Sequence, residues 1–132
     1  MLIKVNCLVE IGYPKKEYFL DHVDREWCLR AVNKNYQLIK VNDIRFYHAL
    51  AEIKRFGIFY LRYQKPNRYY YCIRNSFFMF NEKWIPLFSR IYLLFRNCKQ
   101  LLKIPFVPEP LASCAAVCQA LKEGLASIMK KS

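Results

Sequence analysis

The stretch that decides the fold of this chain is Tyr18-Phe-Leu-Asp-His-Val-Asp-Arg-Glu-Trp-Cys-Leu-Arg30. It begins with apolar and aromatic residues, passes through a cluster of acids, and continues with the spacing of a helix from Asp24 to about Asn33. At the start of that helix, the Asp24 carboxylate can cap free backbone N–H groups and interact favourably with the helix dipole. The pattern is also typical of a strand edge that delivers an acid to the mouth of a cleft.

Residue type alone allows two interpretations of Asp24, a structural helix cap and a catalytic base. The cap is the simpler one, because helix caps are commoner than catalytic bases. In the same helix Trp27 and Ala31 are expected to pack toward the core, and Arg30 is available as an internal counter-ion.

The run Phe19-Leu-Asp-His-Val-Asp-Arg-Glu-Trp-Cys-Leu-Arg-Ala31 resembles the acceptor-side motif of inverting family 2 glycosyltransferases, and within them the bacterial rhamnosyltransferases. The resemblance implies an α/β fold of the GT-A, Rossmann-like type. This chain would be its C-terminal portion, a short β-hairpin plus several helices, and mainly helical. By resemblance Asp24 is the general base that takes the proton of the acceptor hydroxyl, and Asp21 and Trp27 bind substrate. A solvated loop acid is an equally good interpretation of Asp21.

A second motif, Pro66-Asn-Arg-Tyr-Tyr-Tyr-Cys-Ile-Arg-Asn75, also resembles the family. It implies that Arg68 and Arg74 bind substrate, since a helix N-terminus with an arginine suits a diphosphate or a lipid phosphate. The alternative is an amphipathic helix in which Arg74 pairs with an acid.

His48 closes the predicted strand Ile44–His48. In the resembled family a histidine at this place lies near the divalent metal, Mg or Mn, and near the donor diphosphate. The other metal ligands belong to an Asp-x-Asp motif, which does not occur in this sequence. We therefore expect no cofactor in this chain and a metal role for His48 only together with a missing half. An ordinary strand-end histidine is the alternative.

The resemblance covers essentially the whole chain but only the C-terminal part of the family's length. It predicts that residues 1–50 are the acceptor-side remnant of the catalytic domain and that residues 51–132 are a helical, membrane-associating extension. We expect a truncated or split transferase, inactive alone, which acts on a nucleotide-sugar donor and a lipid-linked or glycan acceptor. A separately encoded N-terminal half is a possible partner.

The charge is strongly positive, with 22 Lys and Arg against 10 Asp and Glu, a formal net charge of +12. The segment from Trp84 to Val107 is too interrupted by charge to span a bilayer. It suits a helix in the headgroup region, with Arg96, Lys99 and Lys103 toward anionic lipid, or else a core helix pair. With no secretory signal and unpaired cysteine spacings, we expect a cytoplasmic protein held peripherally at the inner face of the cell membrane.

The remaining elements follow from periodicity and turn signals. Strands are predicted over Tyr36–Val41 and Ile44–Tyr47, and further helices over Arg68 to about Asn81, Trp84 to about Ile104 and Leu111–Met129. Two other functions compete with the transferase: a basic, aromatic nucleic-acid-binding module and a non-catalytic membrane-surface protein. We expect no nucleic-acid partner, because no binding motif is present and the acids between Glu17 and Glu26 would repel phosphates.

Overall fold

The computed structural model describes residues 2–42, 52–56 and 58–131, and all structural statements below concern these residues. The helices and strands, in chain order, are α1 Val5–Ile11, the 3₁₀ helix η1 Lys16–Tyr18, α2 Val23–Asn33, β1 Glu52–Phe56, β2 Phe59–Tyr63, α3 Pro66–Phe80, α4 Leu87–Leu101, the 3₁₀ helix η2 Ile104–Phe106 and α5 Pro110–Lys131.

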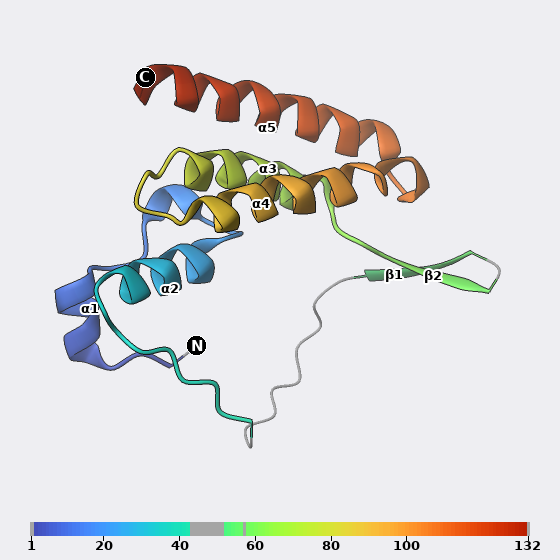
Figure 1. Ribbon diagram of the computed structural model, residues 1–132. Coiled ribbons are helices and arrows are strands. Elements are labelled where there is room, and N and C mark those ends of the chain that lie inside the picture. The colour runs from blue at the N-terminus through green and yellow to red at the C-terminus, as the bar shows by residue number, and fades with distance from the viewer. Residues whose placement is uncertain (1, 43–51, 57, 132) are drawn as a thin grey trace.

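The long helices form layers (Figure 1). Helix α5 covers one side of α3 and α4, while α2 lies on the other side with α1 next to it, and the β1–β2 hairpin extends outward from the start of α3. None of the described helices is both long enough and apolar enough to cross a membrane.

One core holds α5 against α3 and η2. Its buried members include Tyr69 and Ile73 of α3 and Val117 and Ala120 of α5. Gly124 allows the close approach of the two helices, because a Cβ atom there would lie 2.7 Å from the ring of Phe77. Any larger residue would force the helices apart.

Two smaller cores hold the α2 side together. The first packs Tyr18, Met79, Ile85 and Leu93 against partly buried neighbours from α2. The second joins α1 to α2 through the buried residues Ile11, Trp27 and Ala31. The expected packing of Trp27 and Ala31 toward the core is confirmed. The two cores together hold α2 in place from both sides.

The helices predicted from periodicity are confirmed, with ends that differ by a few residues. The helix predicted from Asp24 begins one residue earlier, at Val23. His22 occupies its N-cap position in the left-handed conformation, with φ of 68°. The expected cap at Asp24 is therefore wrong, because the turn at His22 starts the helix first and leaves Asp24 within the first turn.

The strand predicted over Tyr36–Val41 is wrong, since these residues form no strand. The second predicted strand, Ile44–Tyr47, lies outside the described residues. An antiparallel hairpin forms instead from β1 and β2, with Glu52 opposite Tyr63 and Phe56 opposite Phe59. Aromatic and β-branched residues favour strands there, but interleaved Lys and Arg obscured the period in the sequence. The GT-A origin of this arrangement stays a prediction.

Candidate functional site

Helix α2 holds the turn that follows α1 through two side chains. The indole Nε1 of Trp27 donates to the carbonyl oxygen of Gly12 at 2.8 Å, and Arg30 donates to the carbonyls of Ile11 at 3.1 Å and Tyr13 at 3.0 Å. Gly12 has φ of 94°, and a Cβ atom there would lie 3.0 Å from Arg30 Nη1. Trp27 is only 4% exposed, so its side chain is buried and supports the turn after α1. Its predicted role in substrate binding stays a prediction.

Glu26 belongs to the acid-rich motif, but it is buried and forms ion pairs within the protein. Its side chain is fully buried, 3.0 Å from Arg30 Nη2 and 3.6 Å from Lys15 Nζ, and Lys15 also pairs with Glu82 at 2.9 Å. The expected internal counter-ion role of Arg30 is confirmed. The burial of Glu26 was missed, although the i,i+4 spacing of Glu26 and Arg30 was a signal for it.

Asp24 has the opposite surroundings. It lies exposed in the first turn of α2, and within the described structure its carboxylate makes no hydrogen bond or ion pair. Such a carboxylate is accessible to an acceptor hydroxyl and free to take its proton. The general-base role predicted for Asp24 fits this position and stays a prediction.

The structure brings the two sequence motifs together through Asp21 and Arg68. Arg68 Nε donates to Asp21 Oδ2 at 3.2 Å, and the Asn75 side chain donates to the Asp21 carbonyl at 2.7 Å. The ion pair spans 47 residues of sequence. Sequence reasoning placed both residues at substrate but did not foresee that they pair with each other.

Arg74 is held by the protein itself. Its guanidinium donates to the Glu17 carbonyl at 2.6 Å and to Asn75 Oδ1 at 3.0 Å. The expected alternative, a pair with an acid, does not form among the described residues, since the contact to Glu17 is to its backbone carbonyl. The guanidinium also lies within 5.0–5.2 Å of three ring centroids, those of Tyr70, Tyr71 and Phe78.

The predicted metal position cannot be placed in this site. His48 lies outside the described residues, and elsewhere in the described chain no three His, Cys, Asp or Glu side chains come together as a metal site.

A buried polar cluster that the sequence did not reveal lies where α2, α3 and α4 meet. Arg96 Nη2 lies 3.0 Å from His22 Nε2 and 3.1 Å from Cys72 Sγ, and Ser76 Oγ lies 3.1 Å from the same histidine nitrogen. Burial, and then the charges of Arg96 and Arg25, lower the pKa of His22 to about 3. The ring is thus neutral at neutral pH, and its Nε2 accepts from Arg96. The prediction that Arg96 faces lipid is wrong, because this cluster draws the side chain inward.

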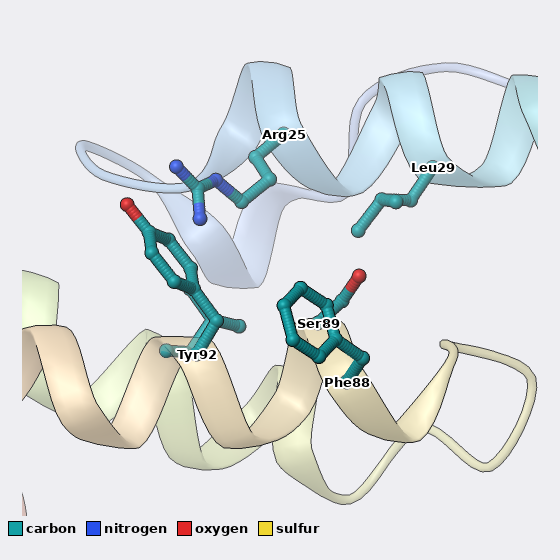
Figure 2. Close-up of a pocket in the computed structure, with 6 residues that line it drawn as sticks. Arg25, Leu29, Phe88, Ser89 and Tyr92 are labelled. Atoms are coloured by element: carbon teal, nitrogen blue, oxygen red, sulfur yellow. The ribbon is translucent and has the colours of Figure 1, made fainter.

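A cavity of about 320 Å³ lies between α2 and α4 (Figure 2). The Arg25 guanidinium reaches over the ring of Tyr92, 5.6 Å from its centroid. Apart from Arg25 the cavity is lined mostly by apolar and aromatic groups, from Leu29, Phe88, Ser89, Tyr92 and Leu93.

Comparison with known proteins relates the chain to a rhamnosyltransferase. It is similar to the dTDP-rhamnosyl transferase RfbF of Shigella flexneri, with 35% identity over 83 residues, which is 61% of this chain and 28% of the relative. The chain therefore spans well under half of that protein's length. No family model and no solved structure matches the chain. The match confirms the predicted relationship to rhamnosyltransferase-like glycosyltransferases.

Proposed function

We propose that this chain forms the acceptor-side part of an inverting glycosyltransferase that moves rhamnose or a related sugar from a nucleotide-sugar to a lipid-linked or glycan acceptor. The observation that carries the proposal is the 35% identity to a dTDP-rhamnosyl transferase. By analogy with that name, a dTDP-linked sugar is the proposed donor.

Asp24 is the proposed general base. It removes the proton of the acceptor hydroxyl as that oxygen bonds to the anomeric carbon and the bond to the nucleotide diphosphate breaks. Its exposure and its lack of partners in the described structure support this role. Asp21 is the proposed acceptor-binding group: one carboxylate oxygen is held by Arg68, and the other makes no hydrogen bond within the described residues.

We propose that the nucleotide-sugar donor is bound mainly by residues other than those described here, as the resemblance to longer glycosyltransferases implies. We propose that a nucleotide-binding unit, on a partner chain or a further segment, completes the enzyme. The 132-residue chain alone is then expected to show no transfer, and turnover of dTDP-rhamnose by it, with no added chain, would contradict this part.

The test joins this chain to the part of the relative that precedes the matched segment and measures transfer to a rhamnose acceptor. Asp24→Asn is expected to lower turnover by ~10²–10⁴-fold, the usual contribution of a general base. Its effect on unfolding should stay below ~1 kcal/mol, the value of a helix-dipole interaction. The matched control is Glu17→Gln, another exposed acid nearby. Near-normal turnover by Asp24→Asn would contradict the general-base role and would leave Asp24 with only a favourable interaction with the dipole of α2.

A second feature supports attachment to a membrane surface. Helix α4 exposes a row of large apolar side chains at helical spacing, of which Phe88 and Tyr92 also line the cavity beside α2, and Lys99 lies 4.8 Å from the ring centroid of Phe95. Aromatic and basic groups on one face suit an interfacial helix on anionic lipid. We propose that this face rests on the inner surface of the cell membrane. Its apolar members are Leu87, Phe88, Ile91, Tyr92, Phe95 and Leu102.

Vesicle flotation tests the attachment. Replacing Phe88 and Phe95 with Ser should release the protein from vesicles containing phosphatidylglycerol, and Lys99→Glu should weaken binding by about 1 kcal/mol. Leu125→Ser, which changes a similarly exposed apolar residue of α5, is the control and should float normally. Equal flotation of all variants would contradict the proposal.

A further inference from the structure

The side chain of Asn75, in α3, holds the acid-rich turn before α2, residues 17–22. Its Nδ2 donates to the carbonyl oxygen of Tyr18 at 2.8 Å and to that of Asp21 at 2.7 Å. Its Oδ1 accepts from the guanidinium of Arg74, at 3.0 Å from Nη2 and 3.2 Å from Nε. Asn75 is fully buried, and both donors and the acceptor of its amide are used. The two carbonyls and the guanidinium therefore fix the amide in one orientation.

The two sequence neighbours of Asn75 hold the same turn at its ends. Arg74 donates to the carbonyl of Glu17 at 2.6 Å. On the other side of Asn75, Ser76 Oγ lies 3.1 Å from the Nε2 atom of His22, and both side chains are buried. Three consecutive residues of α3 thus attach the turn at its first residue, at its middle and at its last residue.

The last residue of the turn has an uncommon backbone conformation that needs such support. His22 has φ of 68°, in the left-handed region that residues other than glycine adopt infrequently. Such conformations persist where the surrounding structure holds them, and they concentrate at functional sites. The His22 carbonyl accepts from the backbone N–H of Glu26 at 2.8 Å, at the start of α2. The turn therefore sets where α2 begins and in which direction Asp24, two residues after His22, leaves it.

The two acids assigned to the acceptor lie on either side of His22. Asp21 has its carboxylate held by Arg68 at 3.2 Å, whereas Asp24 is exposed and its carboxylate makes no hydrogen bond or ion pair within the described residues. A general base must lie within hydrogen-bond reach of the proton that it takes, and a displacement of about 1 Å can lower a rate by ~10²-fold. Among the described residues, the position of Asp24 is thus fixed by the backbone before it.

We propose that Asn75 is a positioning residue of the transferase, which holds the carbonyls of Tyr18 and Asp21 so that the turn presents Asp21 and Asp24 to the acceptor. This inference rests on the proposed function. Asn75 is buried and acts only through the turn, so it is expected to affect the rate of transfer more than the binding of the sugar donor.

Hydrogen exchange followed by mass spectrometry tests the contact on the 132-residue chain itself. Asn75→Ser shortens the side chain and leaves one hydroxyl donor for two carbonyls. Exchange in peptides covering residues 17–26 should become about tenfold faster, because two buried hydrogen bonds are lost, and α5 should be unaffected. The matched control is Asn81→Ser: Asn81, at the other end of α3, donates to the carbonyl of Ser127 in α5 at 3.1 Å, so its loss should spare the turn. Unchanged exchange in the turn, or equal effects of the two variants there, would overturn the proposal.

A second variant guards against general unfolding. Asn75→Asp keeps the shape of the side chain and its contact with Arg74, but it offers at most one donor to the two carbonyls. It should speed exchange in the same peptides while circular dichroism shows a native helix content. If both Asn75 variants lose helix content, Asn75 supports the whole fold and the positioning role is wrong.

Transfer by the enzyme that joins this chain to the preceding part of the relative separates positioning from stability. Asn75→Ser should lower kcat by up to ~10²-fold with little change in KM for the donor, and Asn81→Ser should change neither. In the Asp24→Asn background Asn75→Ser should lower kcat little further, because the two residues act as a unit. Equal losses in both backgrounds would show a merely structural role and overturn the proposal. Near-normal turnover by Asp24→Asn alone would instead contradict the general base, a failure of the proposed function that the exchange experiment does not share.

Discussion

Two neighbouring residues of α2, Arg25 and Glu26, have opposite electrostatic surroundings. Glu26 is fully buried and matched by Arg30 and Lys15, the latter shared with Glu82. Arg25 is half-buried beside Arg96, with no acid paired to either in the described structure. The side of the helix that carries Glu26 thus neutralises its charge within the fold, while Arg25, on the side toward α4, contacts the ring of Tyr92.

The largest expected effect on stability comes from removing the ion pair between Arg30 and the buried Glu26. Arg30→Gln removes a partner of the buried Glu26 and weakens two hydrogen bonds to the turn after α1. We expect a loss of ~3–5 kcal/mol in the free energy of unfolding, because the other charge stays buried with too little compensation. Urea denaturation measures it. A loss below that of Arg25→Gln, which serves as the control on the same helix, would show that Glu26 does not need Arg30 as its partner.

A smaller, pH-dependent effect is expected at His22. Its pKa in the folded chain, about 3, lies below its ordinary value of 6.5. As the pH falls from 6.5 toward 3 the unfolded chain binds a proton that the folded chain does not, so this residue lowers stability on acidification. His22→Asn suits the left-handed backbone and cannot take up that proton. Denaturant titrations at several pH values should show the variant less stable at pH 7 and the gap narrowing toward pH 3. A gap independent of pH would mean that His22 titrates normally.

The smallest effect is expected on the unmatched side. Arg25→Gln gives up a cation–π contact with Tyr92, usually ~0.5–1 kcal/mol at exposed sites, and relieves repulsion from Arg96. The free energy of unfolding should therefore change by less than ~1 kcal/mol. Thermal melting compared with Arg30→Gln decides this. A large loss would mean that Arg25 is structurally matched after all and would remove the contrast between the two sides.

The sequence predicted the parts that depend on local pattern. The helices around Trp27, Tyr69 and Leu93 follow from periodicity, and the packing of Trp27 and the counter-ion role of Arg30 follow from residue type and spacing. The hairpin was misplaced because strands need a partner, and a short apolar run does not tell which partner it finds. The rhamnosyltransferase resemblance came from motif residues and agrees with the relative found.

The sequence by itself determined the helical segments, the acid-rich turn before α2 and the family resemblance, because these rest on neighbours within a few residues. Only the tertiary structure decided that Asp21 pairs with Arg68 across 47 residues, that Glu26 is buried while Asp24 is exposed, and that Arg96 turns inward to His22. The reason is physical. Whether a charge is matched depends on which distant groups the packing of α2, α3 and α4 brings within a few ångströms, and that distance is not a property of the sequence near the charge.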